Sequence, residues 1–275
     1  MGKFDKDSLG NRMKAYEEVN ERMLVANVPF IIRLDGVAFH TFTKKLVRPM
    51  DDILADSMQK TMLSMCMDVP YCKYGYTQSD EITLVCVIDD VKNNSGFYGN
   101  RINKITTVTA AKATKYFNKH FYDNVKKYEK NSKAFENVTD LKVYEKKLFS
   151  AEFDSRVFNI PEHDIENNLI WRQQDAVRNS INALGHAHFT NDLMKNKNTT
   201  QVQDMLMNEK KINWNDCCTY QKRGCCAVKK PVEITCKNGN IITRNKWMLD
   251  LNMPILTEDK ARKELRDILF STMVR

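Results

Sequence analysis

Apolar and polar positions along the first 70 residues alternate between helix-like and strand-like spacing. Residues 9–24 carry apolar side chains among charges, a pattern that suits a surface helix. Residues 28–34 form a short, β-branched apolar run that ends at Asp35, which predicts a central strand. Between Pro49 and Pro70, apolar side chains recur at steps of three and four residues and indicate the buried face of a helix: Ile53, Leu54, Met58, Met62, Met65 and Cys66.

Two further strands, a second long helix and a fourth strand follow. Residues 72–77 and 82–88 are strand-like, and the polar residues 78–81 between them favour a tight β-hairpin. Residues 99–128 return to helical spacing, and residues 149–160 form another strand. The order strand, helix, strand, strand, helix, strand predicts an α+β fold of the ferredoxin-like βαββαβ type, an antiparallel sheet with helices on one face.

The pattern changes after residue 160. A helical stretch at 163–189, another near 199–208 and a cysteine-rich strand pair follow one another without a Gly/Ser or Pro linker. We therefore expect residues 1–150 to form the first unit and residues 151–275 to add mainly helical elements packed on it.

Composition and charge add a few constraints. Hydrophobic residues make up 42% of the 275 positions, enough for an unaided core. Lysine and arginine outnumber aspartate and glutamate by 43 to 35, and this excess favours a polyanionic partner. The polar N-terminus and the lack of any apolar run of about 20 residues lead us to expect a cytoplasmic protein with reduced cysteines. Four cysteines that lack C-x2-C spacing do not favour structural zinc: Cys217, Cys218, Cys225 and Cys226.

Carboxylates stand where the predicted strands end. Asp35 follows the first strand, and Asp80 and Glu81 lie at the predicted hairpin tip. Because the first and third strands are neighbours in this topology, we expect the three side chains to meet. Clustered carboxylates repel one another unless a cation lies between them, and their hard oxygens favour Mg²⁺. Two such ions can activate an attacking hydroxyl and stabilise a leaving pyrophosphate.

The motifs around these carboxylates resemble those of the tRNA(His) guanylyltransferase family. Residues 33–42 and 75–81 look like its two catalytic motifs, and residues 153–158 and 171–180 also fit. So do Trp214-Asn215-Asp216 and Lys222-Arg223-Gly224, and the matches together run from about residue 8 to residue 230.

This resemblance implies a palm domain like that of polymerases, which adds nucleotides in the reverse, 3′ to 5′, direction. Asp35 and Asp80 would hold two Mg²⁺ ions, Gly36 would offer its carbonyl, and Glu81 would support the site. ATP would activate a 5′-monophosphorylated tRNA, and GTP or another nucleoside triphosphate would then be added. Nucleotide contacts would come from Asp35, Gly36, Val37, Ala38, Phe39, His40, Arg48, Ser79, Asp80, Arg101, Lys104 and Asn179. The basic side chains in this set could alternatively be ordinary solvated surface charges. His40 and Asn179 could alternatively have packing roles.

One departure from the family pattern bears on the substrate. The enzymes that add one guanylate to tRNA(His) without a template carry His-Ile-Asn-Asn-Leu-Tyr-Asn where residues 177–183 read Val-Arg-Asn-Ser-Ile-Asn-Ala. The chain therefore resembles the guanylyltransferase-like branch, which repairs 5′-truncated tRNA by copying the opposing strand. The resemblance also implies a homotetramer. Dedicated tRNA(His) guanylylation is the alternative within this chemistry, and a non-catalytic RNA-binding protein or a nucleotide cyclase lies outside it.

Overall fold

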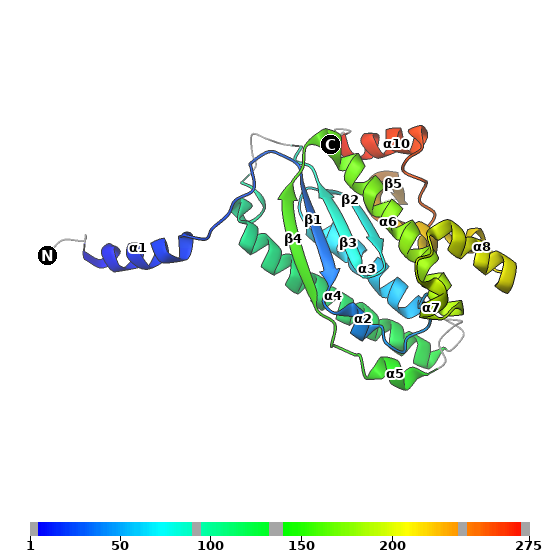
Figure 1. Cartoon of the computed structure of the whole chain (residues 1–275). Coiled ribbons are helices and arrows are strands. Elements are labelled where there is room, and N and C mark those ends of the chain that lie inside the picture. Colours follow the sequence, from blue (N-terminus) through cyan, green and yellow to red (C-terminus); the bar gives the residue numbers. More distant parts are fainter. Residues whose placement is uncertain (1–4, 90–94, 132–139, 236–240, 271–275) are drawn as a thin grey trace.

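A single antiparallel sheet of six strands organises the molecule (Figure 1). The computed structural model describes residues 5–89, 95–131, 140–235 and 241–270. The strands lie in the order β4-β1-β3-β2-β5-β6. Their bounds are β1 Phe30–Gly36, β2 Cys72–Gln78, β3 Glu81–Cys86, β4 Phe153–Asn159, β5 Cys225–Thr235 and β6 Ile241–Asp250.

The predicted ferredoxin-like fold is confirmed. Helix α3 (Asp52–Asp68) joins β1 to β2, and helix α4 (Ile102–Lys130) joins β3 to β4. Both helices pack on the same face of the sheet, behind it in Figure 1. The sheet itself crosses the expected boundary near residue 150, because β4 pairs with β1 and β5 pairs with β2. The two parts of the chain therefore share one sheet.

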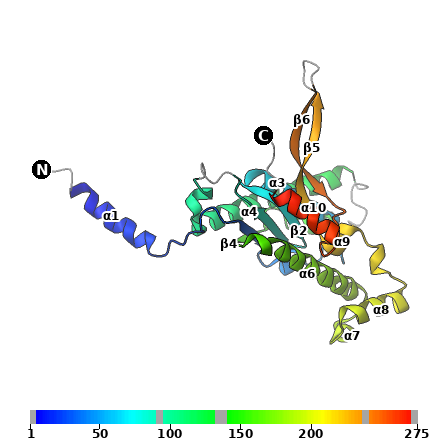
Figure 2. The same ribbon diagram turned by 90° about the horizontal axis from the view of Figure 1, so that it is seen from above.

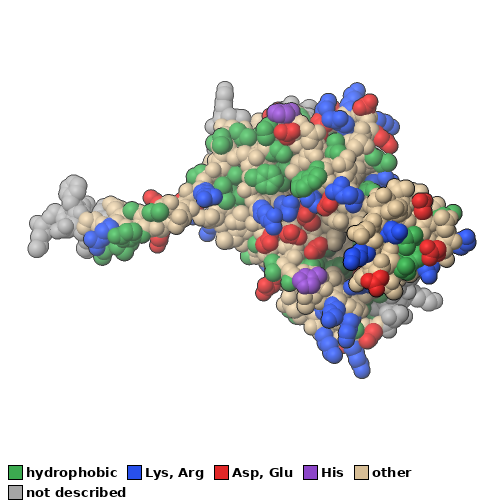
Figure 3. Space-filling model, viewed as in Figure 1, with side chains coloured by type: hydrophobic (Ala, Val, Ile, Leu, Met, Phe, Trp, Pro, Cys, Tyr) green, Lys and Arg blue, Asp and Glu red, His purple; other side chains and the backbone are tan. Residues whose placement is uncertain are grey.

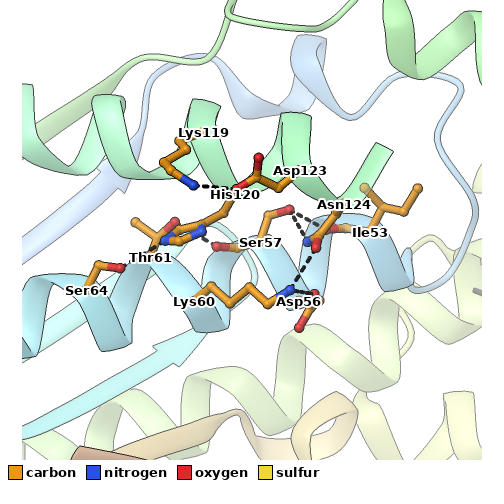
Figure 4. A network of polar contacts seen from close by, with 10 residues as sticks. All are labelled: Ile53, Asp56, Ser57, Lys60, Thr61, Ser64, Lys119, His120, Asp123 and Asn124. Atoms are coloured by element: carbon orange, nitrogen blue, oxygen red, sulfur yellow. Dashed lines mark hydrogen bonds and ion pairs between the residues drawn. The ribbon is translucent and has the colours of Figure 1, made fainter. Parts of the chain in front are cut away.

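Polar contacts between α3 and α4 fix how these helices pack (Figure 4). The buried Asn124 amide donates to Ser57 Oγ over 2.9 Å and accepts from Lys60 Nζ over 2.8 Å. His120 Nε2 lies 2.9 Å from Ser64 Oγ. Because buried polar groups are stable only when they are paired, this network restricts the two helices to one register.

The opposite face of the sheet is only partly covered. Helices α6 (Glu162–His188) and α10 (Asp259–Phe270) pack over β2, β3 and β5 on this side. The buried carboxylate of Glu166 on α6 accepts hydrogen bonds from Arg262 and Arg266 of α10, which holds the two helices together. On β4, by contrast, Asp154, Arg156 and Phe158 stay exposed on this face. The sheet is therefore open above β4 and above the end of β1 that carries Asp35, in front in Figure 1.

Two elements extend away from this body. Helix α1 (Asp5–Glu18) and the β5–β6 hairpin both project outward (Figure 2). The helix expected at 9–24 thus begins earlier and ends at Glu18. The remaining elements are α2 Phe39–Phe42, η1 Phe97–Asn100, α5 Leu141–Glu145, α7 Asn191–Met194, α8 Thr199–Lys210, η3 Trp214–Asp216 and α9 Thr219–Arg223. Within the described ranges, no helix has the length and apolarity needed to cross a membrane.

Candidate active site

The end of β1 lies beside the tip of the β2–β3 hairpin, as the topology predicts. Asp35 is paired in register with Glu81, and the Gly36 amide donates to the Asp80 carbonyl over 3.1 Å. Asp35 and Glu81 belong to the face of the sheet that α6 covers, since their neighbours Leu34 and Ile82 point into the opposite core. The structure therefore brings together the carboxylates that the sequence places 45 residues apart.

Asp80 occupies a turn of unusual backbone conformation. Ser79, the residue before it, has a positive φ of 50°, which is uncommon for a residue with a side chain. The Ser79 hydroxyl donates to Asp80 Oδ1 over 2.9 Å. Burial raises the pKa of the Asp80 carboxyl, and the negative charge of Asp35 raises it further. An added cation would favour the ionised form of Asp80.

Glu81 has different neighbours. Its Oε1 lies 2.9 Å from Arg172 Nε on α6, and its Oε2 lies 3.6 Å from Arg33 Nε on β1. Burial raises the pKa of Glu81, and the two guanidinium groups oppose that effect. Arg33 also lies 4.0 Å from Asp35 Oδ2, and Arg172 lies 2.6 Å from Asp175 Oδ2. A chain of alternating charges therefore leads from Asp35 into α6.

The segment after Asp35 turns sharply over the sheet edge. Ala38 adopts a left-handed conformation, with φ 52°, at the start of α2. Val37 and His40 are exposed next to the carboxylates in the chain, whereas the Phe39 ring is buried against Phe42, Phe117 and Phe153. The backbone and the exposed side chains of this segment can therefore meet a ligand, but the Phe39 ring cannot.

Gly36 has a packing role of its own. A Cβ atom at this position would lie 2.2 Å from Cδ2 of the Phe39 ring. The resemblance implies that Gly36 offers its carbonyl to a metal ion. The structure adds that the space of the missing side chain is filled by an aromatic ring.

A pocket of about 580 Å³ opens on the far side of the hairpin tip, between the start of α3, α6 and α9. Three predicted nucleotide contacts line it: Arg48, Ser79 and Asn179. Asp51 also lines it and caps α3, accepting from the Leu54 and Val47 amides and the Tyr144 hydroxyl. The pocket is large enough for a nucleobase and ribose.

Two predicted contacts lie elsewhere in the chain. Arg101 and Lys104 are exposed at the start of α4, on the helix layer behind the sheet. Arg101 lies 3.7 Å from Glu21, and the Met23–Arg101 bridge places this end of α4 by the segment that leads into β1. In a single chain these two cations therefore lie on the opposite side of the sheet from Asp35. Figure 3 views the molecule from the other, open side of the sheet.

The donor set suits Mg²⁺ that arrives with a triphosphate. Asp35 and Asp80 can offer carboxylate oxygens and Gly36 a carbonyl. In the parts of the chain that the structure describes, no group of three or more His, Cys, Asp or Glu side chains is placed to share a metal ion. Mg²⁺ commonly binds one or two carboxylates and takes its other ligands from phosphates and water, so these residues fit it.

Two arginines, Arg172 and Arg33, lie among the carboxylates of this site. Arg172 lies in the 171–180 stretch that fits the family pattern, and it forms ion pairs with Glu81 and Asp175. Arg33 was not singled out for a role. Its signal was the period of two along a strand, which places it on the same face as Asp35.

Comparisons with known proteins agree with the resemblance in the motifs. A sequence model of Thg1, tRNAHis guanylyltransferase, matches residues 10–161. The probable tRNA(His) guanylyltransferase of Dictyostelium discoideum is 26% identical over 274 residues, covering 94% of this chain and 96% of that protein. A bacterial tRNA(His) guanylyltransferase (Thg1)-like protein, solved with ATP, has a TM-score of 0.78 and 33% identity over 96% of this chain and 100% of its own. Such a protein solved with GTP gives 0.74 and 32% over the same shares.

Proposed function

The chain belongs to the tRNAHis guanylyltransferase family, and on that premise we propose that it is a nucleotidyltransferase that extends the 5′ end of tRNA by copying the opposing strand. The observation that carries this proposal is the meeting of Asp35 and Asp80 at an open sheet edge, beside a pocket of about 580 Å³. Carboxylates at such an edge repel RNA phosphates unless cations lie between them, which favours metal-dependent phosphoryl chemistry over simple RNA binding.

The proposed reaction has two steps. The 5′-phosphate of the RNA takes the adenylyl group of ATP, and pyrophosphate leaves. The 3′-hydroxyl of an incoming nucleoside triphosphate then attacks the activated 5′ phosphorus, and AMP leaves. Mg²⁺ bound at Asp35, Asp80 and the Gly36 carbonyl would supply charge stabilisation to the reacting phosphates.

This chain's own residues would hold the nucleotides in place. Arg48, Ser79 and Asn179 face one pocket, so they can bind the triphosphate and sugar of one nucleotide together. The turn from Val37 to His40 can border the same site through its backbone and exposed side chains. Arg101 and Lys104 could serve this site only if another copy of the chain brought them to it.

Template copying is favoured over addition of a single guanylate. Residues 177–183 depart from the segment typical of dedicated tRNA(His) enzymes. The two bacterial structures, at 33% and 32% identity, are of Thg1-like proteins. The dedicated tRNA(His) activity remains the second candidate, because the Dictyostelium relative bears that name and the motifs are common to both.

The β5–β6 hairpin offers a surface for the RNA backbone. Lys230 and Lys246 lie directly opposite each other, and Arg244 lies two residues from Lys246 on the same face. All three side chains are exposed. Asp250 lies 3.6 Å from Lys230 and offsets part of this charge, but three exposed cations on one face remain in excess. We propose that RNA phosphates contact this basic hairpin face.

Helix α1 offers a surface for self-association. Leu9, Met13 and Tyr16 are exposed and follow the spacing of one helix face. A helix of 14 residues is marginal in water by itself, so this stripe needs a partner surface. We propose that another copy of the chain covers it within a homotetramer. Light scattering on a Leu9→Glu/Met13→Glu variant should give a smaller assembly than the wild type, and an unchanged mass would contradict the proposal.

The deciding experiment for template copying varies the base that the added nucleotide would face. A 5′-truncated, 5′-monophosphorylated tRNA is incubated with Mg²⁺, ATP and one nucleoside triphosphate at a time, for each of four opposing bases. Copying predicts that the nucleotide added is the Watson–Crick partner in all four substrates. Guanylate added whatever the opposing base would instead support the dedicated tRNA(His) activity.

A further inference from the structure

The catalytic edge presents negative charge to any RNA that approaches it. Asp35 and Asp80 meet there, and Asp154 is exposed opposite Asp35 on β4. Carboxylates repel phosphates, and metal ions held by Asp35 and Asp80 would neutralise only the phosphates that react. The rest of an RNA backbone therefore needs cations that lie beside this edge.

Two pairs of lysines follow the short helices that border the edge. One pair follows α2 and the other follows α5. Lys and Arg side chains gather at the lower edge of the open face, where α2 and α5 lie (Figure 1 and Figure 3). We call the four residues the lysine cluster: the exposed Lys44, Lys45 and Lys146, and the half-buried Lys147.

Buried contacts hold the two segments of the lysine cluster together. Asp51 accepts a hydrogen bond from the Val47 amide over 3.1 Å and another from the Tyr144 hydroxyl. Lys147 Nζ lies 5.5 Å from the centre of the Phe42 ring. Because Val47 comes shortly after the first lysine pair and Tyr144 shortly before the second, these contacts fix both pairs on one surface.

A short path links the lysine cluster to the catalytic edge. The amide of Val37, two residues after Asp35, donates to the Glu152 carbonyl over 2.9 Å, so the chain that leaves the edge runs beside the chain that leaves α5. Helix α2 has four residues and spans only about 6 Å. The lysine cluster therefore lies about one helical turn beyond the turn that follows Asp35.

The charge of the lysine cluster has no acidic counterpart among the described residues, where none of its four side chains forms an ion pair. Glu145 is adjacent in the chain and exposed, but it does not pair with them. Burial lowers the pKa of the Lys147 ammonium, and the positive charge of Lys45 lowers it further. Lysines of α3 and α4, by contrast, reach carboxylates over 2.5–2.8 Å: Lys60, Lys112, Lys119 and Lys126.

The nucleotide pocket does not account for this charge. Thr43, Leu46 and Arg48 of the same segment line the pocket, but the lysine cluster does not. A nucleotide bound there carries three phosphates, and Arg48 and metal ions are already available to them. An RNA backbone, in contrast, continues past the site with a phosphate at every residue. The position and the number of the cations therefore fit an RNA strand better than a free nucleotide.

We propose that the lysine cluster binds backbone phosphates of the RNA close to its reacting 5′ end. The proposal deepens the proposed function and rests on it for the identity of the RNA. The lysine cluster is separate from the basic face of the β5–β6 hairpin, because α5 leads into β4 and β6 lies at the opposite edge of the sheet. RNA would thus be held on both sides of the catalytic edge.

The salt dependence of RNA binding measures the phosphate contacts directly. Binding of a 5′-truncated, 5′-monophosphorylated tRNA to the full-length protein is followed by fluorescence anisotropy, without nucleoside triphosphates, over a range of salt concentrations. Each phosphate contact contributes about 0.7–0.9 to the slope of log K against log salt. The double variants Lys44→Gln/Lys45→Gln and Lys146→Gln/Lys147→Gln should each lower that slope by about 1–2. If either double variant keeps the wild-type slope, the four lysines are not one phosphate site.

A matched control removes two positive charges from the helix layer behind the sheet. Lys112 and Lys119 lie on α4 and are paired with Asp68 and Asp123. Lys112→Gln/Lys119→Gln should leave the slope unchanged. If it lowers the slope as much as the other double variants do, RNA responds only to net charge and the proposal is wrong.

Lysine acetylation of the unmutated protein distinguishes RNA from a nucleotide as the ligand. Reaction with an N-hydroxysuccinimide ester is mapped by mass spectrometry with tRNA, with ATP or GTP, and with no addition. We expect tRNA to protect the lysine cluster, ATP and GTP to leave it reactive, and Lys119 to react equally in all samples. Protection by ATP or GTP alone, or no protection by tRNA, would overturn the proposal.

These measurements also separate the proposal from the proposed function. Wild-type protein that binds tRNA through the lysine cluster but extends no RNA would overturn the proposed function and leave the RNA surface standing. Extension by protein whose lysine cluster is not protected would do the reverse. Wild-type protein that does not bind the tRNA even at low salt would overturn the RNA surface itself.

Discussion

Substitution of Gly36 by alanine tests whether the backbone turn after Asp35 is fixed by packing. The new Cβ would lie 2.2 Å from Cδ2 of Phe39, whereas carbon atoms in contact are about 3.5–4.0 Å apart. The ring would have to move by more than about 1 Å to relieve this overlap. It has little room, because ring centres of Phe42, Phe153 and Phe117 lie 4.9, 5.1 and 5.4 Å away.

The expected cost follows from overpacking a filled core. Forcing an extra methyl group into such a site costs about 1–3 kcal/mol of unfolding free energy. For a protein of this size each kcal/mol lowers Tm by roughly 2–4 °C. Gly10→Ala is the matched control, because Gly10 lies in exposed α1 with no atom within 4 Å of the added Cβ. Alanine there should be neutral or stabilising, since it is the better helix former.

A double-mutant cycle identifies the obstacle. In a Phe39→Leu background the ring is absent, so Gly36→Ala should cost less than about 0.5 kcal/mol, measured by chemical denaturation. The single variant should also bind Mn²⁺ with GTP more weakly, because the turn that carries the Gly36 carbonyl would shift. An equal cost of Gly36→Ala in both backgrounds would refute the argument that the Phe39 ring requires glycine.

Three other predictions concern stability and RNA binding. Asn124→Ala removes the partner of Ser57 and Lys60 between α3 and α4, and it should lower the unfolding free energy by about 1–3 kcal/mol; a loss below about 0.5 kcal/mol would contradict the role of this network. Burial raises the pKa of Glu166, but hydrogen bonds from Arg266 and Arg262 outweigh it and lower that pKa below its ordinary value of 4.5. Its contribution to stability is therefore present above pH 4.5 and lost as the pH falls through the lowered pKa, so Glu166→Gln should flatten the acid side of the stability profile. Replacing Lys230, Arg244 and Lys246 together by glutamine should reduce the slope of log K for RNA against log salt by about 2–3, while Lys119→Gln on α4 should leave it unchanged.

Most of the sheet could be predicted because its strands carry simple apolar runs. The strand at 28–34 and the hairpin around Ser79-Asp80 were placed within about two residues, since a buried strand and a polar tip have distinct composition. The helix α6 was expected at 163–189 and spans Glu162–His188. The expected strand pair near the clustered cysteines was only partly correct, because Cys217 and Cys218 precede α9 and β5 begins at Cys225.

The rest depended on contacts that the sequence does not reveal. Helix α10 was not predicted; its arginines find their partner in Glu166, about 100 residues earlier in the chain. The pairing of Glu81 with Arg172 was equally hidden, because it links a hairpin tip to a helix beyond the sheet motif. Arg101 and Lys104 matched the motif pattern, yet in one chain they lie on the helix layer behind the sheet. Short-range patterns predict elements, whereas ion pairs between distant segments are set by tertiary packing.

The most direct test of the central claim compares wild type with Asp80→Asn in 5′-end extension. Each protein is incubated with Mg²⁺, ATP, all four nucleoside triphosphates and a 5′-truncated, 5′-monophosphorylated tRNA. We predict that the wild type extends the 5′ end until the acceptor stem is fully paired, and that Asp80→Asn adds nothing although it stays folded. Absence of extension by the wild type, or equal extension by the variant, would contradict the claim that Asp35 and Asp80 form a nucleotidyltransferase site.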